Sequence, residues 1–148
     1  MISTSRCLRA ASVLLLTISV IACSPQQSAA PTPDPSAVLQ ALPAADAAQY
    51  DHIQDMKTWR NPYLIIRADG VVVLDSADSA EIAVKPDDLL ATLARLPASY
   101  WPYGRVVAAT ENSVRSSEQD GIAIRRNKGI VGGMLRSAHV AIKWVPAA

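Results

Sequence analysis

Hydrophobic and polar residues follow three different patterns along this chain, and each pattern predicts a different kind of segment. A mainly apolar run from 10 to 22 follows two arginines near the N-terminus. The next segment, from 24 to 46, is rich in proline, alanine, glutamine and serine and has few bulky side chains. From 47 to 148, short apolar runs alternate with stretches of helical periodicity, which predicts one packed domain of about 100 residues.

The first half of this domain predicts a β-hairpin. The pair Asn61-Pro62 marks the start of an apolar run at 63–67, and a second apolar run follows at 71–74. Between the two runs stands Ala68-Asp69-Gly70. Asp-Gly between two apolar runs is a strong hairpin signal, so we expect the two runs to pair as antiparallel strands.

Two amphipathic helices are expected after the hairpin. The first begins at Pro86, because proline suits the first helical position, and it ends before Pro97. The second runs from 121 to 138, where apolar residues fall near one face. Glycines inside this helix each cost about 0.8 to 1 kcal/mol relative to alanine, so we expect the helix to depend on docking to a sheet. The glycines are Gly129, Gly132 and Gly133.

Strands at 105–110 and 140–145 follow the two helices, and a short third strand is expected at 81–84. We therefore predict an α+β fold: a small mixed sheet, built from the hairpin and a helix-strand-helix-strand unit, with two helices on one face. If the last strand, 140–145, lies at an edge of the sheet, strand addition through it predicts a homodimer.

The N-terminal apolar run has the positive lead, short apolar centre and small final residue of a secretory signal. Its 13 residues are too few for a membrane span, which needs about 20. The motif Val20-Ile21-Ala22-Cys23 resembles the lipobox of bacterial lipoproteins, in which the cysteine is acylated after cleavage. This resemblance implies a signal peptide at 1–22 and a membrane anchor through acyl chains on Cys23. The alternative is ordinary cleavage near Ser28-Ala29-Ala30.

The lipoprotein resemblance also implies a location. Ser24 follows the cysteine, and by the sorting rule of Gram-negative lipoproteins a residue other than aspartate favours the outer membrane, with the protein facing the periplasm. Anchoring in the inner membrane or at the cell surface is the alternative. Cys7 lies in the removed segment, so the mature chain has no pair for a disulfide. The proline-rich segment 23–46 predicts an extended tether that carries the domain 47–148.

Charge argues against nucleic acid as a partner. Removing Arg6 and Arg9 leaves 12 basic and 13 acidic residues. The balance hides a split, because 24–104 carries 5 basic and 10 acidic residues, whereas 105–148 carries 7 basic and 3 acidic. The C-terminal excess forms either a solvated helix face or a surface for an acidic partner. Most of it comes from Arg115, Arg125, Arg126, Lys128 and Arg136.

The sequence predicts no catalytic residue, metal site or cofactor. His52 and His139 lie far apart and belong to no ligand motif. The paired carboxylates have local explanations at a helix start and in a turn: Asp87 with Asp88, and Asp75 with Asp78. We therefore expect a non-enzymatic protein.

The candidate binding site is the loop between the first helix and the next strand, with Tyr100, Trp101, Tyr103 and Arg105. Loops carry binding residues disproportionately, and exposed rings beside a cation would form a platform for a glycan or a protein. Alternatively, the rings complete the core of a chain that has no phenylalanine.

The stretch from Leu64 to Val145 resembles the periplasmic domain of the ExbD/TolR family. The resemblance rests on Arg67-Ala68-Asp69-Gly70, on the helix start Lys85-Pro86-Asp87-Asp88-Leu89 and on the final helix-to-strand return. That family couples a proton-driven motor to the envelope through an aspartate in a transmembrane helix, and the apolar segment of this chain has no acidic residue. The resemblance therefore implies only an envelope binding module of similar shape.

Two functions from different classes follow. In the first, the chain is a lipid-anchored envelope lipoprotein whose domain binds or scaffolds an envelope protein or peptidoglycan. In the alternative, it is a periplasmic inhibitor or immunity lipoprotein that protects against a secreted toxin. An inhibitor usually inserts a rigid loop, such as 100–105, into the cleft of its partner.

Overall fold

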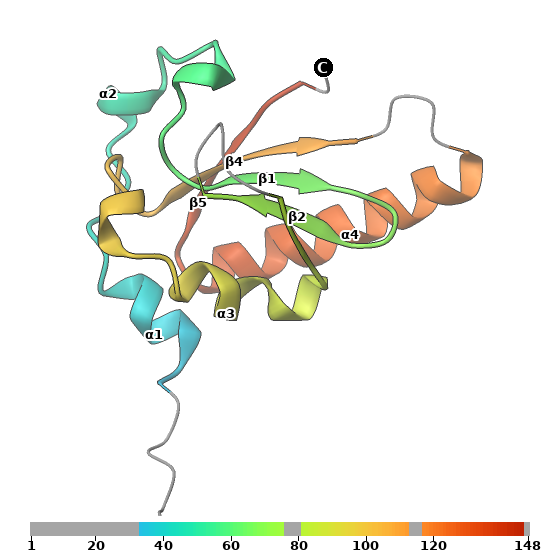
Figure 1. Cartoon of the computed structure of the whole chain (residues 1–148), viewed down its shortest axis with the longest axis horizontal. Helices are drawn as coiled ribbons and strands as arrows, with labels where there is room; N and C mark the ends of the chain where they lie inside the picture. Colours follow the sequence, from blue (N-terminus) through green and yellow to red (C-terminus); the bar gives the residue numbers. More distant parts are fainter. Residues whose placement is uncertain (1–32, 76–80, 113–116, 147–148) are drawn as a thin grey trace, which may run out of the picture. The chain divides into compact units, whose positions relative to one another are not determined.

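The computed structural model describes residues 33–75, 81–112 and 117–146. At its centre lies a five-stranded mixed sheet with the strand order β3-β2-β1-β4-β5 (Figure 1). The α+β fold class and the small mixed sheet are thereby confirmed, and each strand begins and ends within one residue of its predicted bounds. The strands are β1 (Tyr63–Ile66), β2 (Val71–Leu74), β3 (Ile82–Val84), β4 (Val106–Glu111) and β5 (Ala141–Trp144).

The predicted hairpin is formed by β1 and β2, which pair antiparallel with Ile66 opposite Val71. The Arg67 N–H donates to the Gly70 carbonyl at 2.9 Å and closes the turn. A Cβ at Gly70 would lie 2.7 Å from the Val84 carbonyl oxygen, so only glycine lets the turn lie against β3. β3 continues the antiparallel pairing beyond β2, whereas β4 and β5 pair parallel.

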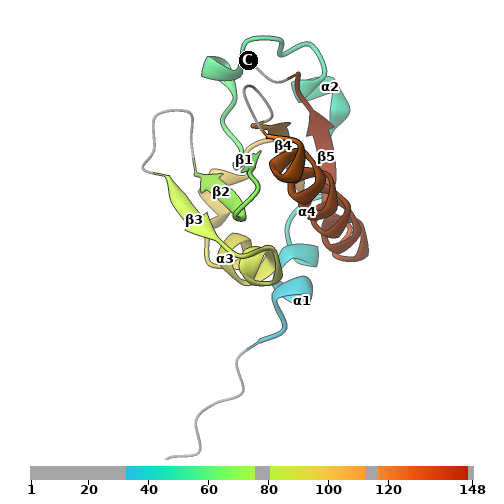
Figure 2. The ribbon, with the colours of Figure 1, turned by 90° about the vertical axis from the view of Figure 1, so that its right-hand side faces the viewer.

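Three helices cover one face of the sheet (Figures 1 and 2). Two of them, α3 and α4, were expected from the sequence, and α1 is an addition. The α-helices of the described residues are α1 (Pro35–Gln40), α2 (Ala47–Tyr50), α3 (Leu89–Ala94) and α4 (Glu118–Ser137). Short 3-10 turns are η1 (Met56–Thr58), η2 (Pro86–Asp88) and η3 (Ala98–Tyr100).

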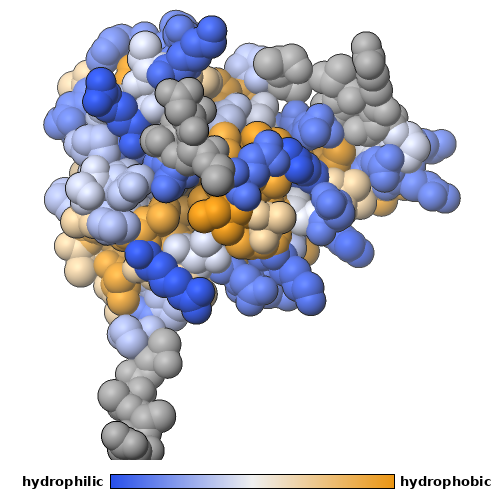
Figure 3. Space-filling model, in the orientation of Figure 1, coloured by the Kyte–Doolittle hydropathy of each residue, from blue (hydrophilic) through white to orange (hydrophobic). Residues whose placement is uncertain are grey.

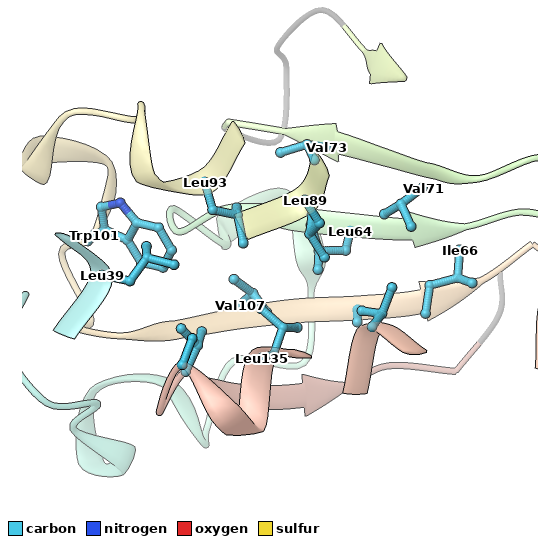
Figure 4. Close-up of a cluster of buried hydrophobic side chains, with 14 of the residues drawn as sticks. Leu39, Leu64, Ile66, Val71, Val73, Leu89, Leu93, Trp101, Val107 and Leu135 are labelled. Atoms are coloured by element: carbon cyan, nitrogen blue, oxygen red, sulfur yellow. The ribbon is translucent and has the colours of Figure 1, made fainter. Parts of the chain in front are cut away.

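The main core lies between this sheet face and the three helices (Figure 4). Alternate strand residues point into it, because side chains of a strand alternate between the two faces of its sheet. The core members labelled in Figure 4 are Leu39, Leu64, Ile66, Val71, Val73, Leu89, Leu93, Trp101, Val107 and Leu135.

The opposite face of the sheet is partly covered by the segment that contains α2 and η1. A second buried cluster lies there, made of Ile53, Trp59, Val106 and Ala108. Lys143 on β5 reaches across this face, and its Nζ donates to the backbone carbonyls of Tyr50 and Asp51 at 3.0 Å each. Burial, together with the nearby carboxylates of Asp51 and Asp46, raises the pKa of Tyr50 above its usual value.

The prediction that 23–46 is an extended tether is wrong from residue 34 onwards. The Asp34 carboxylate accepts from the Ser36 N–H and caps α1, and Pro35 takes the first helical position. Leu39 on α1 is completely buried in the main core. Among the described residues, the domain therefore includes the chain from Pro33 onwards rather than only from 47. The predicted signal peptide, Cys23 and the remaining part of the tether lie outside the described residues.

Helix α4 begins three residues before the predicted position. Ser117 and Asp120 form a capping box, in which the Ser117 Oγ accepts from the Asp120 N–H at 3.1 Å and the Asp120 carboxylate accepts from the Ser117 N–H at 3.2 Å. The helix ends at Ser137, and His139, the residue after its C-cap, has a φ of 58°, as is common just beyond a helix C-terminus. Apolar periodicity does not reveal this first turn, because its residues are polar.

Replacing Gly129 or Gly133 by alanine is expected to raise the free energy of unfolding by about 0.8 to 1 kcal/mol each. Both positions are exposed, and a Cβ at either would meet no atom within 4 Å outside its own helix backbone. Thermal unfolding followed by circular dichroism should show the melting temperature rise by about 4 to 8 °C per substitution. Ala123→Gly in the same helix is the matched control and should lower it. A fall in the melting temperature of both alanine variants would contradict the prediction.

Candidate functional site

The aromatic loop was the site predicted from the sequence, and the structure places most of it inside the protein. Trp101 is only 3% exposed and lies in the main core with Leu39 and Leu93 (Figure 4). The Tyr103 ring packs on Trp59, with ring centroids 5.3 Å apart. Burial of Trp101 contradicts the prediction of an exposed three-ring platform, because the rings are used to complete the core.

A buried side chain, Asn61, holds this loop in place. Asn61 is completely buried, and its Nδ2 donates to the carbonyls of Gly104 and Val106 at 2.8 and 2.7 Å. Its Oδ1 accepts from the Tyr103 N–H at 3.0 Å. The sequence marked Asn61 only as the start of a strand, since nothing in it shows that residues more than 40 positions away are its partners.

The last predicted site residue, Arg105, also has a structural role. It is partly buried, and its Nη1 donates to the Gln40 carbonyl at the end of α1, at 3.3 Å. Its backbone N–H donates to the Pro43 carbonyl at 2.9 Å. Arg105 therefore connects the loop to the N-terminal segment and is not a free cation at the surface.

One predicted residue, Tyr100, does line a surface hollow. The hollow measures about 440 Å³ and is bordered by Arg60, Ser99, Tyr100 and Pro102. Arg60 was not predicted, because it lies in a different segment that only the fold brings to the loop. Of the predicted three-ring platform, only the Tyr100 ring lines this hollow, next to the exposed Arg60.

A larger hollow, of about 630 Å³, lies between β3 and α3, and we call it the β3–α3 groove. Ile82, at the start of β3, is 42% exposed beside it. Figure 3 shows the face of the molecule that carries the β3 edge, where hydrophobic surface lies between hydrophilic side chains. The groove is lined by Ile82, Ala83, Val84, Lys85, Asp88, Ala91, Thr92, Arg95 and Leu96.

The backbone of β3 is also part of this surface. β3 is the terminal strand of the sheet and pairs through one edge with β2. Within the described ranges, no other strand pairs with its outer edge. Since an antiparallel strand turns alternate N–H and C=O groups to opposite sides, the outer edge presents donors and acceptors beside the groove.

The charges around the groove are mainly positive. Lys85 and Arg95 are exposed and take part in neither ion pair that the described residues form. Glu81, next to β3, is instead paired with Arg67 at 2.9 Å. Asp88 is the one acidic group among the lining residues. The groove therefore combines an apolar floor, a free strand edge and two available cations.

The basic residues of α4 are divided between structural and exposed positions. Lys128 is paired with Glu111, and its ammonium lies 4.5 Å from the centre of the Trp144 ring. Arg125, Arg126 and Arg136 are exposed, and Arg115 lies outside the described residues. Both interpretations of this helix face, solvated surface or docking surface, therefore stay open for the three exposed arginines.

In the part of the chain that the structure describes, no three side chains of His, Cys, Asp or Glu come together in a way that would hold a metal ion. None of the described helices combines the length and the apolar character that crossing a membrane requires. The groove and the hollow beside Tyr100 are surfaces on which a partner could bind.

Comparisons with protein-family models, with curated proteins and with solved structures gave no match to this chain. The resemblances to bacterial lipoproteins and to the ExbD/TolR periplasmic domain accordingly stay predictions.

Proposed function

We propose that this chain is a non-enzymatic, lipid-anchored envelope lipoprotein whose α+β domain binds another envelope component. The lipobox ending at Cys23 would supply the anchor and, with Ser24 after it, an outer-membrane location facing the periplasm. One observation carries the binding role: a groove with an apolar floor runs beside a sheet edge with which no strand of the described ranges pairs. Because main-chain donors and acceptors at a strand edge recognise other main chains, this surface favours a protein partner over peptidoglycan.

The length of chain between anchor and domain limits where the partner lies. The described domain starts at Pro33 and its first helix at Pro35, so only about ten residues separate Cys23 from the folded part. Fully extended, these residues span about 35 Å, compared with roughly 60 Å for the longer tether expected from the sequence. The domain would therefore act close to the lipid surface, on a partner in the membrane or next to it.

The alternative function, an inhibitor or immunity lipoprotein, expects a projecting loop that enters the cleft of a toxin. The loop 100–105 does not project in this way, because Trp101 is buried and Asn61 binds the loop backbone at Tyr103 and Gly104 and the start of β4 at Val106. The geometry therefore favours an envelope binding module.

The anchor is tested by Cys23→Ser. We expect this variant to lose incorporation of labelled palmitate completely and to lose membrane association, because the thiol that accepts the lipid is absent. Cys7→Ser is the matched control, since Cys7 lies in the segment that cleavage would remove, and it should label like the wild type. Palmitate labelling of the Cys23→Ser protein, together with retention in the membrane fraction, would overturn the anchor.

The binding role is tested by photocrosslinking in intact cells. A photoreactive amino acid is placed at Thr92 in the groove, at Tyr100 in the smaller hollow or at Ser137 on α4. We expect a discrete crosslinked protein from Thr92 and none from Ser137. Sedimentation of the protein with purified peptidoglycan, combined with no crosslinked protein at any position, would show instead that the ligand is the cell wall.

A further inference from the structure

We propose that the β3–α3 groove binds an extended, acidic segment of a partner protein, which adds a sixth strand to the outer edge of β3. This inference rests on the proposed function, since it specifies the kind of partner that the envelope module binds. Three properties of the groove carry it: a strand edge with which none of the described strands pairs, the small side chains on α3, and two cations that form no ion pair among the described residues.

The first property is the free edge. β3 pairs with β2 in the register Val71–Val84, Val72–Ala83 and Val73–Ile82. Pairing continues unbroken from β2 to β3, so the outer edge of β3 is aligned to accept another strand in the same way. β3 has only three residues and is followed at once by Pro86, which limits the added strand to a short segment.

The second property is the space over the helix-facing side of β3. Ile82 and Val84 lie on that side, because their partners Val73 and Val71 belong to the main core. A strand added at the edge would point alternate side chains the same way, toward α3. There the small side chains of Ala91 and Thr92 line the groove. Apolar side chains at alternate positions of the segment would fill this space and bury the exposed part of Ile82.

The third property is charge. Lys85 precedes α3 and Arg95 follows it, so a cation stands at each end of the helix wall. Asp88 is close in sequence to Lys85, whereas no acidic lining residue is close in sequence to Arg95. An acidic side chain of the segment would therefore meet Arg95, and a basic segment would be repelled.

Two other occupants fit these properties less well. The chain's own segment 24–32 has no charged side chain and no bulky apolar one, and Pro25 and Pro31 in it lack a backbone N–H. The groove of a second copy carries the same excess of positive charge, from Lys85 and Arg95 against Asp88, so its charge does not complement the groove that it would meet. A separate acidic segment meets neither difficulty.

The inference is tested with synthetic peptides and the full-length chain, purified from membranes in detergent. The probe is an eight-residue peptide of alternating threonine and valine with glutamate at both ends, and its counterpart carries lysine at both ends. We expect fluorescence anisotropy to show the glutamate peptide binding about fivefold more tightly than the lysine peptide. N-methylation of alternate amides should abolish binding in one register and leave it unchanged in the other, because only one set of N–H groups faces β3.

Arg95→Glu is expected to reverse the preference, so that the lysine peptide binds more tightly, an outcome that misfolding would not produce. Arg136→Glu, an exposed charge reversal on α4, is the matched control and should leave the preference unchanged. The inference would be overturned if Arg95→Glu and Arg136→Glu changed the peptide preference equally. It would also be overturned if both methylation registers changed binding equally, or if no peptide bound. The proposed function would survive that result if photocrosslinking still captured an envelope protein through another surface, and it would fail if no position gave a partner.

Discussion

Asn61→Ala is expected to lower the free energy of unfolding by about 3 to 5 kcal/mol. The side chain makes three hydrogen bonds inside the protein, to the carbonyls of Gly104 and Val106 and from the Tyr103 N–H. Removing it leaves the Val106 carbonyl and the Tyr103 N–H without these partners, whereas the Gly104 carbonyl still accepts from the Val106 N–H at 2.8 Å. Each unsatisfied buried group costs about 1 to 3 kcal/mol. Urea unfolding followed by tryptophan fluorescence measures the loss, since Trp59 and Trp101 pack beside the affected segments.

Two companion variants show whether the hydrogen bonds are the cause. Gln54→Ala alters an exposed side chain in the same part of the chain and should change the free energy of unfolding by less than about 0.5 kcal/mol. Asn61→Asp keeps the acceptor for Tyr103 but replaces the amide donor with a carboxyl group that faces two carbonyl oxygens. A loss below about 1 kcal/mol for Asn61→Ala would show that these bonds do not hold the loop.

Asn61→Asp should also make stability depend on pH. Burial and the two carbonyls disfavour the carboxylate, so the pKa of the introduced group is raised in the folded state above about 3.9, its value in the unfolded chain. The folded protein then binds more protons than the unfolded one between these two pKa values, and stability falls as the pH rises through that window. Relative to the wild type, Asn61→Asp should therefore be less destabilised at pH 4 than at pH 8.

Gly104→Ala is the second substitution with a large expected effect, a loss of at least about 3 kcal/mol. Gly104 has a φ of 73°, which L-residues rarely adopt, and a Cβ there would lie 2.2 Å from the Ala44 carbonyl oxygen. The obstructing atoms belong to the backbone of Pro43 and Ala44, so rotation of a side chain cannot relieve the overlap. We expect the segment that carries α1 to separate from the loop, with a large fall in the melting temperature.

Gly133→Ala is the matched control for Gly104→Ala, because the chemical change is identical. At Gly133 the added methyl group meets open space in a helix and should stabilise the protein. The two substitutions are therefore expected to shift the melting temperature in opposite directions. Equal shifts would show that the close approach of Gly104 to Ala44 does not determine the stability of the loop.

Local patterns predicted most of the secondary structure. The Asp-Gly turn, the proline at the start of the first predicted helix and the run from 121 to 138 all depend on interactions between neighbours in the chain, which periodicity and turn chemistry reveal. The error at α1 has the opposite cause. Proline and alanine dominate the composition from 24 to 46, and a helix of six residues is too short to show periodicity. Its stability comes from burying Leu39 against the core, which is a tertiary contact.

The candidate site was predictable only in part for the same reason. An aromatic loop is conspicuous in a sequence, but whether Trp101 faces solvent depends on α1 and α3, which close over it. The β3–α3 groove is the reverse case. The sequence of its residues predicts only a short strand and the start of a helix. No pattern among neighbouring residues indicates that the strand lies at an edge of the sheet.

The sequence alone determined the class of fold, the hairpin, the positions of the two predicted helices and the lipobox hypothesis. Each of these rests on residues that are neighbours along the chain. The tertiary structure decided which strands are edges, where the domain begins and which aromatic rings are buried. Those properties depend on contacts between distant segments, such as the hydrogen bonds from Asn61 to Gly104 and the packing of Leu39 with Trp101. The free energy of such contacts is gained only when the whole domain closes, so no local pattern encodes them.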